Sequence, residues 1–242
     1  GDFLDIALVL TKIGVDVLCV DVAHGHHSMM RHALTVLRNT IGNDVHIMAG
    51  NVATLEGFND LADWGANSIR VGIGGGSICS TRIQTGHGQP TFASVLDCAR
   101  SDRDAALIAD GGIRTPGDIV KALAAGADSV MLGSMLAGTE ESPGKVFQQP
   151  SGHSVKAYRG MASKEAQVEW RGRVASDEGV SRFIPFKGPV TSIIKGLEKN
   201  IKSGLSYSGA DTIRKLQSSA KFIRQSSSAQ VESSTHVDLV KG

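Results

Sequence analysis

Apolar residues gather in five short runs between Val15 and Met135. The runs are "VDVLCVDVA", "VHIMAGN", "NSIRVGIG", "AALIADGG" and "DSVMLGSM". Each has the length of one buried strand, and amphipathic stretches with a helical period lie between most of them. The expected helices include residues 29–41, 55–64 and 116–125. Strands that alternate with helices predict a parallel β-sheet in an α/β fold.

The helix expected at residues 116–125 carries a full set of start and stop signals. Thr115 stands at the N-cap, Pro116 at the first helical position and Asp118 three residues after the cap. Gly126 supplies the stop. The side chains of Thr115 and Asp118 can each accept from a backbone N–H that has no partner within the helix, so we expect a capping box here.

Polar residues or glycines stand at the carboxyl end of all five runs. They are Asp21, Asn51, Gly72 to Gly76, Asp110 and Ser134. A (β/α)8 barrel builds its active site on this rim from several strands, whereas a doubly wound sheet concentrates its chemistry at one switch point. The pattern therefore favours the barrel. Five β/α units do not close eight strands, so we expect about three strands before Gly1 and interpret the chain as the C-terminal units.

Charge and composition exclude several classes of protein. The 242 residues carry 25 basic and 24 acidic side chains and are 41% apolar. This balance gives no basic surface for nucleic acid, and no apolar run has the roughly 18 residues of a membrane span. Three widely spaced cysteines argue against a disulfide frame. We expect one cytoplasmic globular domain without a nucleic-acid or membrane partner.

The last two strand ends have the chemistry of an anion site. "ADGGIRTPGD" places two glycines and a capped helix after one strand, and "MLGSMLAGTEESPG" places Gly133 and Ser134 after the next. Free N–H groups in such turns bind anions, and the corresponding loops of a (β/α)8 barrel commonly bind phosphate. Tight turns alone explain either loop equally well. The pair together favours a phosphate site.

Cys79 lies inside the glycine-rich loop "RVGIGGGSICSTRIQTGHG". Its neighbours Ser77, Ser80 and Thr81 place the thiol in a polar loop from which it can attack a substrate, so we interpret Cys79 as a candidate nucleophile. Cys19 and Cys98 stand in apolar patterns and are expected to be small buried residues.

Two clusters of charged or titratable residues have simpler explanations. His24, His26 and His27 allow a zinc site, but we favour a rim loop near a cofactor. A solvated face is expected for Lys164, Lys187, Lys195, Lys199 and Lys202.

Several loops resemble the signature loops of the IMP dehydrogenase/GMP reductase family. They are "GIGGGSICSTR", "ADGGIRTPGDIVKALAAGAD", "VMLGSMLAGTEESPG" and "YRGMAS", and the similarity runs from about Val15 to the tail "SSAQVESSTH". The resemblance implies a (β/α)8 barrel, a homotetramer and NAD(P)-dependent oxidoreductase chemistry on a purine nucleoside monophosphate. In this family a cysteine attacks C2 of the purine and forms a covalent intermediate.

The resemblance also implies roles for single residues. Cys79 is the expected nucleophile, with Thr81 and Glu178 as its catalytic partners. The residues expected to bind GMP or IMP are Ser77, Asp110, Gly112, Gly133, Ser134, Tyr158, Gly160 and Met161. Asp21 and Gly72 are expected at the cofactor, either NADPH or NAD.

A potassium site is implied at the carbonyls of Gly74, Gly76 and Cys79, closed by Glu232 of a neighbouring subunit. Ser233 and Ser234 stand where glycines are usual in members that close the site in this way. Residues 225–242 are therefore either this closing tail or a Ser-rich solvated tail. Residues 1–224 form the expected barrel portion, and we call residues 162–184 within it the flap segment.

The flap segment bears on the direction of the reaction. Only 14 residues separate Ser163 from Glu178, and they lack the Arg-Tyr pair that activates water in the dehydrogenases. This favours a GMP reductase, which uses a threonine and a glutamate. "CVDVAHGH" and "YRGM" are closer to the dehydrogenases, so IMP dehydrogenase remains the alternative. A non-catalytic nucleotide-binding relative is the second alternative.

Overall fold

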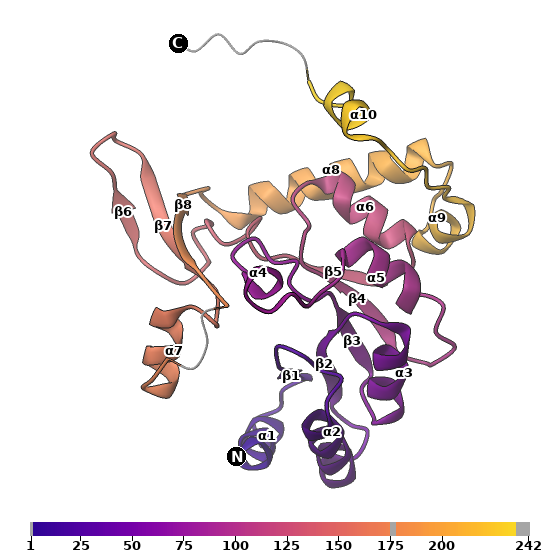
Figure 1. The fold of residues 1–242 in the computed structure, drawn as a ribbon, viewed down its shortest axis with the longest axis vertical. Coiled ribbons are helices and arrows are strands. Elements are labelled where there is room, and N and C mark those ends of the chain that lie inside the picture. The colour runs from indigo at the N-terminus through magenta and orange to yellow at the C-terminus, as the bar shows by residue number, and fades with distance from the viewer. Residues whose placement is uncertain (1, 175–177, 236–242) are drawn as a thin grey trace.

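A computed structural model describes residues 2–174 and 178–235 of the protein. Its main sheet has five parallel strands in the order β1-β2-β3-β4-β5 (Figure 1). The strands are β1 (Val17–Asp21), β2 (His46–Val52), β3 (Ser68–Val71), β4 (Ala106–Asp110) and β5 (Ser129–Met131). All five predicted strands are confirmed.

Helices precede the sheet and connect its strands. They are α1 (Phe3–Lys12), α2 (Ser28–Ile41), α3 (Leu55–Asp63), α4 (Thr81–Thr85), α5 (Thr91–Cys98) and α6 (Pro116–Ala124). At α6 the capping box is present, because Thr115 Oγ1 accepts from the amide of Asp118 at 3.2 Å and Asp118 Oδ2 accepts from the amide of Thr115 at 3.0 Å. The signals read from the sequence therefore set the start of this helix.

One face of the sheet is fully buried at its centre. Ile47, Ala49 and Val52 of β2 have no exposed surface, and Ile69 and Val71 of β3 have none either. All five residues pack in one apolar cluster with side chains of the covering helices, whereas the other face of β3 carries Arg70. The register sets Asp21 opposite Gly50, and Gly50 opposite Arg70. It therefore brings the carboxyl ends of neighbouring strands to one edge.

A second, antiparallel sheet follows β5 and was not predicted. It contains β6 (Val146–Gln148), β7 (Ser154–Arg159) and β8 (Ser181–Pro185), with α7 (Lys164–Arg171) between β7 and β8. Figure 1 shows this sheet to one side of the parallel sheet. Lys156 of β7 is only 1% exposed, and its ammonium donates to the carbonyls of Thr139 at 2.9 Å and of Ser142. These bonds replace water around a buried charge and hold the chain after β5 against β7.

Three helices complete the described chain: α8 (Val190–Tyr207), α9 (Ile213–Ser219) and α10 (Ser227–Glu232). Leu197 of α8 and Leu216 of α9 pack with Ile119 and Leu123 of α6 in a small apolar cluster. The start of the predicted tail thus contains a helix, while its residues 236–242 lie outside the described residues. Across the described ranges, none of the helices has both the length and the apolar character needed to cross a bilayer.

Candidate active site

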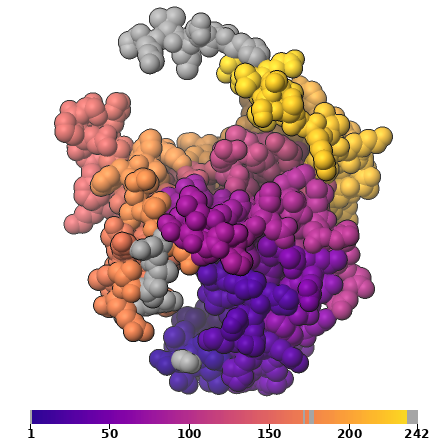
Figure 2. Space-filling view, viewed as in Figure 1, coloured from indigo at the N-terminus to yellow at the C-terminus, as the bar shows by residue number. Residues whose placement is uncertain are grey.

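A cavity of about 690 Å³ lies at the carboxyl ends of the parallel strands. In Figure 2 the surface is hollowed between the orange part of the flap segment and the indigo N-terminal elements. The predicted site residues that line the cavity are Asp21, Gly72, Gly74, Gly76, Cys79, Thr81, Asp110, Gly160, Met161 and Glu178. Residues from distant parts of the chain therefore face one space.

Cys79, Thr81 and Glu178 form a hydrogen-bonded row on the wall of this cavity. The thiol Sγ of Cys79 donates to Thr81 Oγ1 at 3.1 Å, and Thr81 Oγ1 donates to Glu178 Oε2 at 2.8 Å. All three residues are partly buried, so the row is shielded without being closed to a ligand. A proton can move along this row between the sulfur of Cys79 and the carboxylate of Glu178.

Glu178 reaches this row because the end of the flap segment pairs with the glycine-rich loop that contains Cys79, which we call the cysteine loop. The amide of Ser80 donates to the carbonyl of Glu178 at 2.8 Å, and the amide of Val180 donates to the carbonyl of Ile78 at 3.1 Å. Gly179 also lets this end of the flap segment lie close to its start, since a Cβ there would lie 2.5 Å from the backbone nitrogen of Ser163. Two backbone hydrogen bonds thus fix a carboxylate opposite a hydroxyl 97 residues away in sequence.

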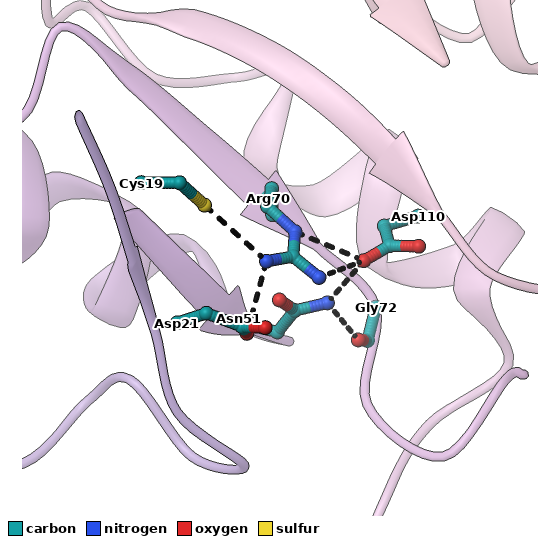
Figure 3. Close-up of polar contacts among 6 residues, drawn as sticks. All are labelled: Cys19, Asp21, Asn51, Arg70, Gly72 and Asp110. Carbon is teal, nitrogen blue, oxygen red and sulfur yellow. Dashed lines mark hydrogen bonds and ion pairs between the residues drawn. The ribbon is translucent and has the colours of Figure 1, made fainter. Parts of the chain in front are cut away.

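The floor of the cavity holds a network of one guanidinium and two carboxylates (Figure 3). Arg70 donates to Asp110 Oδ2 through Nε at 3.1 Å and Nη2 at 2.9 Å, and its Nη1 lies 2.9 Å from Asp21 Oδ1. Asn51 Nδ2 donates to Asp110 Oδ2 and to the carbonyl of Gly72, each at 2.8 Å. The network therefore links the carboxyl ends of the four neighbouring strands β1 to β4.

Arg70 stays charged in this setting although its side chain is only 13% exposed. Burial works to lower its pKa, but the carboxylates of Asp110 and Asp21 outweigh burial and raise the pKa. No role for Arg70 was predicted from the sequence. The sequence could have indicated this network, because an arginine inside an apolar strand run needs a partner of opposite charge when it is buried.

The two other cysteines differ from one another. Cys98 is fully buried, as expected, and burial raises the pKa of its thiol to about 12. The expectation for Cys19 is wrong, because this residue is exposed, lines the cavity and accepts from Arg70 Nη1 at 3.6 Å. Its position on β1 two residues before Asp21 gives both side chains the same face of the strand.

Gly133 and Ser134, which are expected at the phosphate, lie in a turn after β5 that we call the phosphate turn, residues 133–138. The carbonyl of Gly133 accepts from the amides of Leu136 and Ala137, both at 3.0 Å. Tyr158 lies against this turn, since a Cβ on Gly133 would be 2.9 Å from the Tyr158 hydroxyl oxygen. The tyrosine hydroxyl and the start of the turn can therefore face the same anion.

Two further predicted residues lie on loops next to these groups. A Cβ on Gly112 would be 3.8 Å from the carbonyl oxygen of Gly75, so the loop after β4 touches the cysteine loop. Ser77 is an exposed residue of that cysteine loop. Both loops can thus approach one ligand from neighbouring strand ends.

The proposed cation carbonyls belong to the cysteine loop, whereas Glu232 lies on α10, well apart from this loop in Figure 1. Gly76 O accepts from the amide of Cys79 at 3.1 Å and keeps a second lone pair.

Within the described ranges, no group of three or more His, Cys, Asp and Glu side chains is arranged to hold a metal. His26 instead pairs with Asp60 at 2.8 Å, and His27 caps α2.

Comparisons with known proteins agree with this geometry. A family model described as the IMP dehydrogenase / GMP reductase domain matches residues 2–236. The chain is 44% identical to inosine-5′-monophosphate dehydrogenase of Nitrosopumilus maritimus, over 98% of the chain and 52% of the relative. It is 45% identical to GMP reductase of Leishmania major, over 95% of the chain and 49% of the relative. The chain thus spans about half the length of these curated relatives.

Solved structures give the same result. A cysteine-to-alanine variant of Trypanosoma brucei GMP reductase, in complex with guanosine 5′-monophosphate, has a TM-score of 0.93 and 41% identity, covering 98% of this chain and 51% of that one. Legionella pneumophila inosine 5′-monophosphate dehydrogenase has a TM-score of 0.82 and 48% identity, covering 93% and 70%. The α/β class is confirmed, and the parallel sheet is part of a (β/α)8 barrel. Sequence and structure together show that the chain belongs to the IMP dehydrogenase/GMP reductase family.

Proposed function

We propose that the protein is a purine nucleotide oxidoreductase that works as a GMP reductase. The reaction converts GMP, NADPH and two protons to IMP, NADP⁺ and ammonium. The observation that carries this proposal is the row from Cys79 Sγ through Thr81 Oγ1 to Glu178 Oε2. A site that only held a nucleotide has no use for a thiol coupled to a proton carrier.

The row supports a balanced sequence of bond changes. The sulfur of Cys79, after loss of its proton, forms a bond to C2 of the purine. Thr81 and Glu178 then deliver a proton to the departing amine, and the C2–N bond breaks as ammonia leaves. When bound, the reduced nicotinamide supplies a hydride to C2, and the C2–S bond breaks to release IMP and restore the thiolate.

The remaining groups are assigned by their positions around this row. Asp110 binds the ribose hydroxyls of the nucleotide, and Gly160 and Met161 contact the base. The phosphate is held by Ser77, Gly112, Gly133, Ser134 and Tyr158. Met161 suits a base contact because it lines the cavity with 67% of its surface exposed.

Asp21 and Gly72 are assigned to the cofactor. The carboxylate of Asp21 is 57% exposed at the cavity wall and suits a pair of ribose hydroxyls. We also propose potassium at the carbonyls of Gly74, Gly76 and Cys79, with Glu232 supplied by a neighbouring subunit of a homotetramer.

IMP dehydrogenase is the second candidate function. It is favoured by the 44% identity to the Nitrosopumilus maritimus relative, which nearly equals the 45% identity to the Leishmania major GMP reductase. This activity needs water to attack the covalent intermediate, so Thr81 and Glu178 must then activate water in place of protonating an amine.

One pair of assays separates the candidates. The protein is mixed with GMP and NADPH and separately with IMP and NAD⁺, while absorbance of the reduced cofactor is followed. We expect loss of NADPH and release of ammonia in the first mixture. Rapid NADH formation with XMP as product shows the dehydrogenase, and nucleotide binding without either reaction shows a non-catalytic relative.

A further inference from the structure

Lys187, two residues after β8, is fixed against the phosphate turn. Its ammonium donates to the carbonyl of Ser134 at 2.6 Å and to that of Met135 at 2.9 Å. The lysine is exposed, as expected, but its ammonium also has protein partners. Although much of the side chain is exposed, its charged end is bonded to the backbone of another segment.

The rest of Lys187 is held as firmly as its ammonium. Its amide donates to the carbonyl of Gly138 at 2.8 Å, and the carbonyl of Gly188 accepts from the amide of Glu140 at 2.9 Å. The aliphatic stem packs over Gly138, where a Cβ would lie 3.3 Å from Lys187 Cγ. The side chain thus leaves a fixed backbone and has little freedom to turn away from the phosphate turn.

The two carbonyls that Lys187 binds belong to peptide units whose N–H groups are those of Met135 and Leu136. A peptide unit is planar and trans, so its N–H points opposite to its carbonyl. When Lys187 holds the carbonyl of Ser134, the amide of Met135 points away from the lysine. Within residues 2–174 and 178–235, no acceptor is paired with the amides of Gly133, Ser134 or Met135, which are thus free to bind a ligand.

We infer that Lys187 is a positioning residue for the 5′-phosphate of the nucleotide, acting through the carbonyls of Ser134 and Met135. This inference rests on the proposed function, in which the phosphate turn binds that group. Before the ligand binds, Lys187 holds the phosphate turn in one orientation. It does so by donating to carbonyls on the side of the turn that faces away from the ligand. The affinity gained is therefore specific to ligands that carry the phosphate.

The test compares GMP with guanosine by isothermal titration calorimetry on the full chain. We expect Lys187→Gln to weaken GMP binding by about tenfold, the effect of losing hydrogen bonds from a charged donor, and to leave guanosine binding within about twofold. Lys187→Arg is expected to keep most of the GMP affinity, because a guanidinium also reaches two carbonyls. Lys199→Gln, at an exposed lysine of α8, is the matched control and should change neither ligand.

Thermal unfolding of each variant separates a positioning role from a structural one. If Lys187→Gln does not fold, Lys187→Met replaces it, because this change keeps the stem over Gly138. Failure of both to fold, or an equal loss of GMP and guanosine affinity, overturns the inference in favour of general structural support. Unchanged GMP affinity in Lys187→Gln also overturns it.

The wild-type protein tests the underlying function in the same experiment. Equal affinities for GMP and guanosine in the wild type refute the phosphate turn as a binding site, and the inference fails with it. A preference for GMP that persists fully in Lys187→Gln refutes only the role of Lys187.

Discussion

The guanidinium of Arg70 makes two hydrogen bonds to one carboxylate oxygen of Asp110, at 3.1 and 2.9 Å, across the neighbouring strands β3 and β4. Its third nitrogen lies 2.9 Å from Asp21 on β1. One cation therefore orients both carboxylates that we assign to ribose hydroxyls, one of the nucleotide and one of the cofactor. Neither carboxylate can move without loss of a charged hydrogen bond.

Arg70→Lys is expected to raise the KM for both GMP and NADPH. A lysine keeps the charge but lacks the planar fork that serves two carboxylates at once. Loss of one such bond costs about 1.5–3 kcal/mol, which corresponds to a rise of tenfold or more. Steady-state kinetics with each ligand varied in turn measures this. Arg100→Lys, at an exposed ion pair, is the control, and a rise in only one KM contradicts the shared role.

Cys79→Ala is expected to abolish turnover and to preserve GMP binding, because the proposed ribose and phosphate ligands lie on other segments. Cys98→Ala should retain nearly full activity. The measurements are the rate of NADPH loss and the calorimetric affinity for GMP. Full activity of Cys79→Ala, or equal losses in both variants, shows that another group attacks the purine.

Glu178→Gln is expected to slow turnover by about 10²–10⁴-fold, the usual contribution of a positioned general acid or base. The amide keeps the shape of the side chain and an acceptor for Thr81 but carries no transferable proton. The KM for GMP should change little. Glu165→Gln is the matched control, because Glu165 lies in the flap segment and accepts from Ser181 on the segment itself. A similar loss in both variants indicates a disturbed flap segment.

Cys98 is expected to make the folded protein less stable at high pH. Burial raises its pKa to about 12, whereas the thiol ionises near 9.0 in the unfolded chain. Above pH 9 the unfolded state therefore loses the proton first, and stability falls between pH 9 and 12 by at most about 1.4 kcal/mol per pH unit. Denaturant unfolding across this range should show a steeper decline in the wild type than in Cys98→Ala. Parallel curves contradict a buried neutral thiol.

Local patterns predicted much of this fold. The five apolar runs became the five parallel strands, since each strand buries apolar side chains against the covering helices. The signals around Thr115 and Asp118 predicted the start of α6, because capping depends on residues three positions apart. The antiparallel sheet was missed. Its strand β7 contains Lys156, and the carbonyls that make burial of this charge possible belong to another segment.

The sequence by itself also determined the family and the residues available for chemistry: a thiol in a glycine-rich loop and polar groups at each strand end. Only the tertiary structure decided which of them meet. Glu178 reaches Thr81 through backbone pairing with the cysteine loop, and Arg70 joins Asp21 to Asp110 through strand register. Lys187 reaches the phosphate turn in the same way. Hydrogen bonds act over about 3 Å in space, so their partners depend on how segments pack and not on their spacing along the chain.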